Sequence, residues 1–183
     1  TLATCRSAPL SEMASVMMKV SQNLYAETLL KTLGARGGEP TVEGGRKVVR
    51  EVLAGWGIAP ESFVPYDGSG LSRYNYVTAG MLVTILGRMH ADPRHQAAFD
   101  QTLPVAGRDG TLERRMRGSA AEGNVRAKTG TIANVRTLSG YVRTRDGELL
   151  AFSILANHFT APAAVIDAVT DLVVERLAAF SRH

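Results

Sequence analysis

Hydrophobic residues recur at helical spacing over most of the chain before residue 120. Met13, Val16, Met17 and Val20 lie three or four positions apart, as on one face of a helix, and Ser11 stands where an N-cap would. The same spacing returns in further stretches, separated by segments that carry glycine or proline. The pattern predicts helices over residues 11–20, from about 24 to 33 with an end at Gly34, 48–56, 75–89, 95–101 and 111–116.

The pattern changes to that of strands from Val125 onward. Residues 137–144 and 148–157 predict a β-hairpin, joined by Arg145-Asp146-Gly147 with an Asp-Gly turn. The segment around Lys128 is expected to pair beside the first of these strands. The result is a meander of three antiparallel strands in which Lys128 lies on an edge strand.

The last stretch, residues 163–180, spaces its hydrophobic residues as one stripe of a helix. We expect this stripe to pack against the sheet and cover it. Helices, then a meander, then a covering helix describe an α+β fold. Because the chain shows no internal repeat, low-complexity tract or linker, we expect residues 1–183 to form one unit without an internal boundary. The stripe consists of Val165, Ile166, Val169, Leu172, Val173, Leu177 and Phe180.

Composition places the chain among globular proteins, with 183 residues of which 45% are hydrophobic and 21% charged. The formal net charge is +4, and the arginines are spread along the chain. A local cluster of Arg114, Arg115 and Arg117 is expected to be solvated surface. Since no basic stripe combines with aromatic or groove-reading elements, nucleic acid is not an expected partner.

The residues that bind metals or form disulfides are sparse. The single cysteine, Cys5, excludes an internal disulfide framework and a multi-cysteine zinc site, and we expect it to be at least half-buried. The four histidines show no His-Glu-x-x-His spacing. No stretch approaches the roughly 18 apolar residues that span a bilayer. We therefore expect no metal, no cofactor and no transmembrane segment.

Two short segments carry candidate chemistry. Lys128, Thr129 and Gly130 place a cation, a hydroxyl and a glycine on an expected edge strand, which suits capture of a carboxylate and a peptide backbone. Ser21 and Asn23 stand between the first two predicted helices. Residues two apart on a continuous helix point about 200° away from each other, so these two could serve one site only where the backbone departs from the helix. The alternative is that Ser21 caps the second helix and Asn23 is a solvated neighbour.

Taken together, Ser-x-Asn on an interhelical loop and Lys-Thr-Gly on a later strand resemble the second and third active-site motifs of penicillin-binding proteins and serine β-lactamases. Over nearly its whole length the chain resembles the class C low-molecular-mass penicillin-binding proteins, the D-alanyl-D-alanine carboxypeptidase/endopeptidase family. The resemblance implies part of the β-lactamase/transpeptidase-like fold. The flanking segments that carry it are Arg6–Leu10, Asn23–Glu27, Asp67–Arg73 and Leu138–Tyr141.

The family's nucleophile lies in a Ser-x-x-Lys motif, which this chain lacks. In the family that motif precedes Ser-x-Asn, so we expect these residues to be the C-terminal portion of a longer enzyme, with the missing N-terminal part of the same protein as a partner. A truncated chain, a cleaved chain and a true pseudoenzyme all remain open. The residues three before Lys19, Lys31, Lys47 and Lys128 are Val16, Thr28, Gly44 and Val125.

The resemblance also implies roles for the polar residues of the site. Ser21 would relay a proton between the absent catalytic lysine and the leaving amine, since a hydroxyl both donates and accepts. Asn23 would donate to a substrate backbone carbonyl and steady that lysine. Lys128 would supply positive potential for the substrate carboxylate.

The remaining implied roles concern substrate binding. Thr129 would hydrogen-bond the carboxylate, Gly130 would let the peptide lie along the strand, and the Thr131 N–H would form half of the oxyanion hole. Arg73 could pair with a stem-peptide carboxylate. A structural salt bridge is an equally good interpretation of Arg73.

The resemblance implies a fragment of a serine D,D-carboxypeptidase/endopeptidase that acts on the D-Ala-D-Ala end or D-Ala cross-link of peptidoglycan stem peptides and is acylated by β-lactams when complete. The chain alone should be inactive. The implied location is the periplasm or cell envelope of a bacterium. A non-catalytic peptidoglycan- or partner-binding module is the alternative, and a serine β-lactamase is less favoured because no deacylating glutamate can be assigned.

Overall fold

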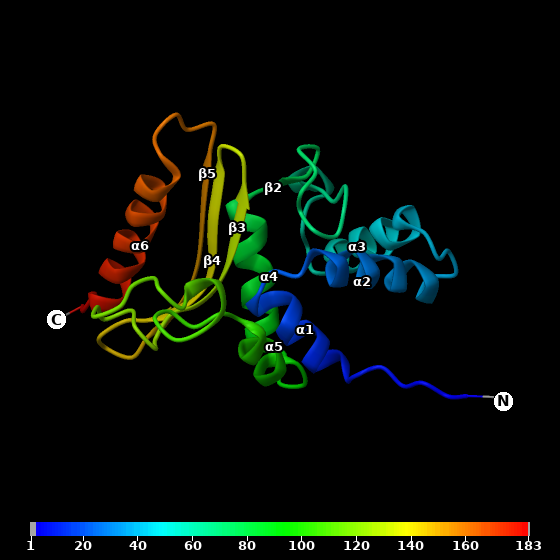
Figure 1. Cartoon of the computed structure of the whole chain (residues 1–183), viewed down its shortest axis with the longest axis horizontal. Coiled ribbons are helices and arrows are strands. Elements are labelled where there is room, and N and C mark those ends of the chain that lie inside the picture. The colour runs from blue at the N-terminus through cyan, green and yellow to red at the C-terminus, as the bar shows by residue number, and fades with distance from the viewer. Residues whose placement is uncertain (1–2, 183) are drawn as a thin grey trace.

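The computed structural model describes residues 3–182, which form the expected α+β arrangement. A sheet of three strands stands at the centre, with α6 along one face, α4 along the other, and the remaining helices beyond α4 (Figure 1). The predicted antiparallel sheet, helical cluster and C-terminal helix are therefore confirmed. The helices are α1 (Leu10–Lys19), α2 (Asn23–Arg36), α3 (Val42–Gly55), α4 (Ala79–Ala91), α5 (Gln96–Thr102) and α6 (Ala163–Ala179), with 3-10 turns η1 (Pro60–Ser62) and η2 (Gly110–Leu112). The strands are β1 (Phe63–Val64), β2 (Tyr76–Val77), β3 (Arg126–Ile132), β4 (Val135–Arg143) and β5 (Leu149–Asn157).

The central sheet has the order β3–β4–β5 with antiparallel pairing throughout. Lys128 lies opposite Ser139, and Ser139 lies opposite Ser153. Gly147, in the turn between β4 and β5, has a φ of +83°, a conformation that glycine adopts without steric cost. The predicted hairpin, its Asp-Gly turn and the pairing of the Lys128 segment beside it are confirmed.

The pattern did not predict the second sheet, a pair of two-residue strands. Phe63 pairs with Val77 and Val64 with Tyr76, in antiparallel orientation. Two residues are too few for an alternation of apolar and polar positions to be recognised. The pair closes the base of the loop at residues 65–75.

The start of α1 differs from the prediction. The helix begins at Leu10, and the carbonyl of Pro9 accepts the N–H groups of Glu12 and Met13 at 3.0 and 3.2 Å. Ser11 lies inside the first turn and caps nothing, so its predicted role as N-cap is wrong. Cys5 is exposed, also contrary to expectation, in a stretch before α1 whose described residues are all exposed.

The second helix does not end at Gly34. α2 continues because Gly34 is buried where α3 crosses it, and a Cβ there would lie 2.7 Å from the backbone nitrogen of Gly45. α3 starts early, with Thr41 as its N-cap accepting the Gly44 N–H at 3.0 Å. Glycines that looked like helix breaks therefore allow two helix backbones to approach closely.

The α4 helix begins later than predicted. Thr78 is its N-cap and accepts the Met81 N–H at 3.1 Å. Asn75, the predicted start, instead fixes the preceding loop, accepting the Tyr66 N–H at 2.8 Å and donating to Asp67 at 2.8 Å. The Asn75 side chain therefore forms hydrogen bonds within the loop and does not cap a helix.

A helix over residues 111–116 is also not observed. Only the 3-10 turn η2 forms, and Met116 has a φ of +58°, which ends any helical path. Contrary to the prediction, Arg115 in this segment is not part of the solvated surface. It donates to Asp171 of α6 at 2.7 and 3.0 Å, and the two side chains are only 19% and 17% exposed. The segment is thereby tied to α6.

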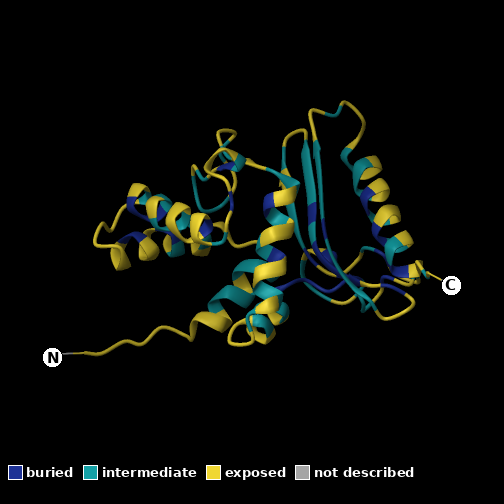
Figure 2. Ribbon diagram, turned by 180° about the vertical axis from the view of Figure 1, so that it is seen from behind, coloured by how far each residue is buried: buried dark blue, intermediate teal, exposed yellow. Residues whose placement is uncertain are grey.

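The largest hydrophobic cluster lies between the sheet and α6, whose buried residues are Thr170, Val174 and Ala178 (Figure 2). Most of the predicted stripe lies on the wrong side of the helix, although Leu177, one of its members, packs against this cluster. Because α6 is apolar on both sides, periodicity alone could not identify the side that faces the sheet. Five members of the stripe are about half exposed: Val165 49%, Val169 54%, Leu172 52%, Val173 45% and Phe180 48%.

None of the helices within residues 3–182 has both the length and the hydropathy to cross a membrane.

Candidate active site

Ser21 lies where the backbone breaks between α1 and α2. Its φ of +57° falls in the left-handed region, which is uncommon for residues other than glycine and often marks a functional loop. Gln22 caps α2, accepting the Leu24 N–H at 3.2 Å. The backbone therefore departs from the helix here, and the alternative in which Ser21 caps the second helix is wrong.

Lys128 reaches from β3 to this break. Its Nζ donates to Ser21 Oγ at 2.9 Å and to the Thr129 carbonyl oxygen at 2.6 Å. Burial lowers the pKa of Lys128 to about 8. Residues 107 positions apart thus meet, and the ammonium is held where its proton is easily lost.

Asn23, two residues after Ser21, does not join this contact. It is the first residue of α2 and is exposed. Within the described part of the chain its side chain makes no hydrogen bond to Ser21 or Lys128. Its amide is therefore free to bind another group.

Thr129 and Thr131 lie on an open part of the edge of β3. The Ala127 N–H points away from β4 and donates to the Pro104 carbonyl at 2.9 Å. Because backbone groups alternate along a strand, the N–H groups of Thr129 and Thr131 point toward the same side. Among residues 3–182 no strand pairs with that side beyond Arg126, so a ligand peptide could be added there.

Thr111 is a site neighbour that sequence reasoning missed. It lies in η2, and its Oγ1 accepts a hydrogen bond from Thr129 Oγ1 at 2.8 Å. A single threonine after an Asp-Gly pair carries no distinguishing signal, so only the fold reveals the contact.

Packing against β4 explains why a glycine is required at position 130. A Cβ at this position would overlap Thr137 Oγ1, which lies directly opposite on β4. Within the chain itself, then, the neighbouring strand excludes a side chain here.

The loop with Arg73 is anchored near the start of α2. Asp67 accepts the Ser72 N–H at 2.7 Å, and Glu27 of α2 accepts the Ser69 N–H at 2.9 Å. Arg73 is exposed, and no ion pair links it to another of the described residues. The interpretation of Arg73 as a structural salt bridge finds no support.

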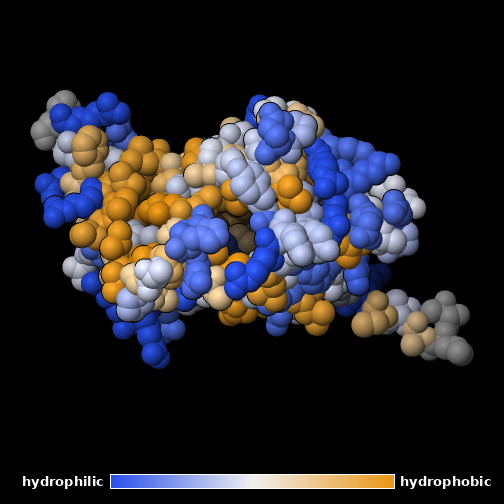
Figure 3. All heavy atoms as spheres, turned by 90° about the horizontal axis from the view of Figure 1, so that it is seen from above, coloured by the Kyte–Doolittle hydropathy of each residue, from blue (hydrophilic) through white to orange (hydrophobic). Residues whose placement is uncertain are grey.

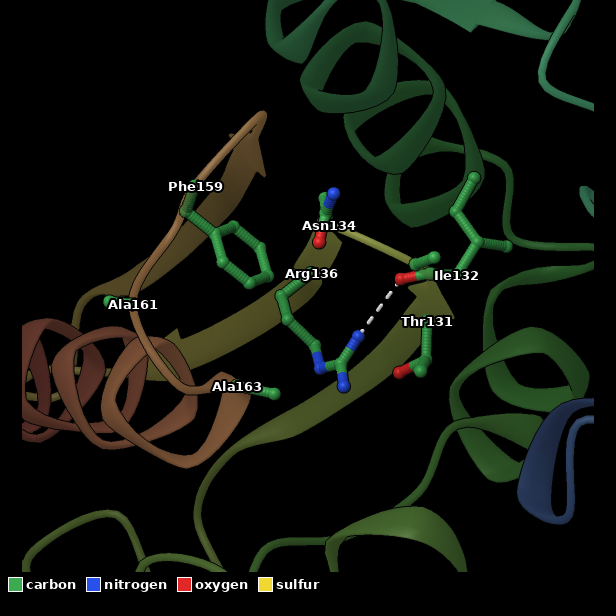
Figure 4. A pocket seen from close by; sticks show the side chains of 8 residues that line it. Thr131, Ile132, Asn134, Arg136, Phe159, Ala161 and Ala163 are labelled. Atoms are coloured by element: carbon green, nitrogen blue, oxygen red, sulfur yellow. Dashed lines mark hydrogen bonds between the residues drawn. The ribbon is translucent and has the colours of Figure 1, made fainter.

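A hollow of about 410 Å³ opens next to Thr131, between the β3–β4 turn and the start of α6 (Figure 4). Arg136 stands in its wall and donates to the carbonyls of Ile132 and Val135 at 3.0 and 2.9 Å. Asp167 of α6 lies 3.8 Å from the Arg136 guanidinium. These contacts fix the turn that follows Thr131.

The site therefore combines one ammonium, the hydroxyls of Ser21, Thr129 and Thr131, one free amide and an open strand edge. Such a set can bind a carboxylate, align a peptide and relay a proton. Within residues 3–182, no three His, Cys, Asp or Glu side chains come together as metal ligands would.

Comparison with known proteins gives concordant matches. Residues 1–178 match the model of the D-Ala-D-Ala carboxypeptidase 3 (S13) family. A D-alanyl-D-alanine carboxypeptidase from Actinomadura sp. is 46% identical over 188 residues, which cover 100% of this chain and 34% of that protein. The chain thus spans about a third of the length of this curated relative.

Solved structures agree on the fold. Penicillin-binding protein 4 (dacB) from Haemophilus influenzae, complexed with a novel β-lactam, superposes with a TM-score of 0.85 at 27% identity, covering 94% of this chain and 42% of that one. The TLA-1 extended-spectrum β-lactamase gives a TM-score of 0.66 at 15% identity over 92% of this chain and 61% of that one, a likeness of fold alone. The predicted β-lactamase/transpeptidase-like fold is confirmed.

Proposed function

Since the chain belongs to the D-Ala-D-Ala carboxypeptidase 3 (S13) family, we propose that it forms the substrate-receiving half of a serine D,D-peptidase site. The substrate is the D-Ala-D-Ala end, or a D-Ala cross-link, of a peptidoglycan stem peptide. The observation that carries this proposal is the 2.9 Å contact between Lys128 Nζ and Ser21 Oγ beside the open edge of β3. It brings a proton relay and a cation to the place where a peptide can lie.

The cation and the threonines bind the end of the substrate. Lys128 attracts the terminal carboxylate, and the Thr129 hydroxyl donates to it. The peptide lies along β3, opposite Gly130, as an added strand. The Thr131 N–H then donates to the carbonyl oxygen that becomes an oxyanion, and Arg73 binds a further carboxylate of the stem peptide.

The proton relay acts on the scissile bond. A serine oxygen attacks the penultimate D-Ala carbonyl, the C–N bond breaks, and the leaving amine takes a proton through Ser21 Oγ. Asn23 donates its amide to the peptide backbone. Water then hydrolyses the acyl ester. A β-lactam reacts with the same serine and remains attached to it as an acyl ester, in keeping with the β-lactam complex of the Haemophilus influenzae relative.

The attacking serine comes from outside these 183 residues, because none of the four lysines is preceded by serine at the Ser-x-x-Lys spacing. We assign it to the N-terminal part of the same protein. The Actinomadura relative is about three times as long as the matched region, which leaves room for such a part.

The surface that receives this part lies on the side of α6, where hydrophobic residues gather (Figure 3). The outer side of α6 exposes Val165, Val169, Leu172 and Val173, and a group of exposed large apolar side chains often marks a surface that another polypeptide covers. Beside it, β5 has no partner on its second edge among the described residues. A helix against α6 and a strand beside β5 would cover both.

The location follows from the substrate. A protein that acts on peptidoglycan works in the periplasm or the cell envelope of a bacterium, and we propose that location for the protein that contains this chain.

Titration of the ¹⁵N-labelled chain with N-acetyl-D-Ala-D-Ala tests the receiving half. We expect saturable shifts of the Lys128–Thr131 amides and no release of D-alanine. The same dipeptide with a C-terminal amide lacks the carboxylate and should bind at least tenfold more weakly, since charged hydrogen bonds contribute about 1.5–3 kcal/mol. Equal binding of the two peptides, or none of either, would contradict the proposal.

A non-catalytic peptidoglycan- or partner-binding module is the second candidate, favoured by the absence of Ser-x-x-Lys from the sequence. It predicts the same binding without turnover. The gene upstream of Thr1 distinguishes the two, because only the peptidase needs a Ser-x-x-Lys motif there. A serine β-lactamase is less favoured, since the β-lactamase likeness extends to the fold alone.

A further inference from the structure

The segment Asp109-Gly110-Thr111 touches both halves of the site. We propose that it is a positioning strut, which sets the separation of Ser21 from Lys128 and orients the Thr129 hydroxyl toward the ligand carboxylate. The orienting part of this inference rests on the proposed function, whereas the spacing part does not. No residue of the segment belongs to the Ser-x-Asn or Lys-Thr-Gly motifs.

The first end of the strut holds α1. Asp109 Oδ2 accepts a hydrogen bond from Lys19 Nζ at 2.6 Å, and Lys19 is the last residue of α1, two before Ser21. Gly110 lies against the Lys19 backbone, because a Cβ at Gly110 would be 2.5 Å from the Lys19 carbonyl oxygen. The φ of Gly110 is +56°, so both its conformation and its close approach favour glycine.

The middle of the strut is fixed to the start of β3. Asp109 Oδ1 accepts the Val105 N–H at 2.8 Å, and Val105 forms a β-bridge with Arg126, the first residue of β3. Leu112, which follows the strut, is fully buried in the main hydrophobic cluster. The two carboxylate oxygens of Asp109 therefore connect the end of α1 to the chain that pairs with β3.

The second end of the strut is Thr111, 2.8 Å from Thr129 Oγ1. A hydroxyl has one proton to donate. When Thr129 donates to a carboxylate, it can no longer donate to Thr111, and the pair reverses so that Thr111 donates to Thr129. Thr111 thus holds the Thr129 oxygen as an acceptor and leaves the Thr129 proton for the ligand.

The orienting role is tested by a double-mutant cycle on dipeptide affinity with Thr111→Val and Thr129→Val. Each single variant should bind N-acetyl-D-Ala-D-Ala about tenfold more weakly than the unaltered chain. The double variant should lose no more than Thr129→Val alone, because Thr111 acts through Thr129. Thr111→Ser keeps the hydroxyl and should bind within about twofold of the unaltered chain. Losses that multiply in the double variant, or unchanged affinity in Thr111→Val, would overturn this role.

The spacing role is tested without a ligand, through the Gln22 amide, which donates to the Met17 carbonyl at 3.0 Å at the Ser21 break. Asp109→Asn keeps an acceptor for Val105 but loses the charge opposite Lys19. Hydrogen exchange at Gln22 should accelerate about fivefold to tenfold. Asp92→Asn is the matched control, since it removes a carboxylate from an exposed pair with Arg94 outside the site.

Unchanged exchange in Asp109→Asn, or equal acceleration in Asp92→Asn, would overturn the spacing role. The two tests also separate the strut from the proposed function. If the unaltered chain fails to bind the dipeptide, the proposed function and the orienting role fail together, while the exchange measurement still decides whether Asp109 holds the Ser21 break in place.

Discussion

The two edges of the central sheet are both open, but their surroundings differ in chemistry. At the β3 edge, Lys128 donates to the Ser21 hydroxyl at 2.9 Å and to the Thr129 carbonyl at 2.6 Å, and the Thr129 hydroxyl donates to Thr111 at 2.8 Å. At the β5 edge, the neighbouring α6 exposes Val169 and Leu172 by more than half. A polar edge with preformed contacts suits a small charged ligand, whereas an apolar surface suits a polypeptide.

The contrast shows that an unpaired strand edge does not by itself indicate what binds there. The side chains around the edge decide it. At β3 they supply charge and donors in fixed positions. At β5 they supply hydrophobic area, which contributes roughly 25 cal/mol per Å² when covered.

Removing the charge from the β3 edge should have the largest effect on ligand binding. Lys128→Met keeps an unbranched side chain and deletes the ammonium. Affinity for N-acetyl-D-Ala-D-Ala should fall by up to about a hundredfold, because the carboxylate loses its charged partner. Chemical-shift titration measures this, with Lys31→Met on the exposed side of α2 as the matched control. Retained binding in Lys128→Met would mean that the β3 edge does not receive the carboxylate.

The two sides of α6 allow a second test with one kind of substitution. Val174 is fully buried and Val169 is 54% exposed. Val174→Ala should lower the free energy of unfolding by about 1–3 kcal/mol, whereas Val169→Ala should change it by no more than about 0.5 kcal/mol. Urea denaturation of the chain measures both. Equal losses would show that the outer side of α6 is already packed, and the contrast between the two edges would disappear.

The pH dependence of ligand binding gives the smallest of the three effects. Burial lowers the pKa of Lys128 to about 8, so the residue is mostly ammonium at pH 7 and mostly neutral at pH 9. Only the ammonium attracts a carboxylate, so dipeptide affinity should fall about tenfold as the pH rises between these values. Titrations at several pH values measure the change, which Lys128→Met should abolish. Affinity that is constant or rises over this range would contradict the assignment.

Much of the β3 edge could be predicted from the sequence. The alternation after Val125 and the Asp-Gly turn predicted the hairpin, and the pairing of β3 beside it followed. Ser21 and Asn23 could serve one site only where the helix is broken, and the backbone does depart from the helix at Ser21. Local pattern was sufficient because these features depend on short stretches of chain.

The α6 side could not be predicted in the same way. With apolar residues on both sides of the helix, the choice between Val169 and Val174 depends on which side meets the sheet, and that is a tertiary property. The end of α2 was missed for a related reason, since Gly34 stays within its helix where α3 crosses it. Thr111 and Asp109 reach the site through long-range contacts, which leave no periodic signal in the sequence.

The central claim is that these residues receive the substrate but do not attack it. Intact-mass spectrometry of the purified chain after incubation with benzylpenicillin tests this most directly. We expect an unchanged mass, because no Ser-x-x-Lys serine is present to form the ester. A stable increase in mass equal to one penicillin molecule, located on any serine of the chain, would contradict it.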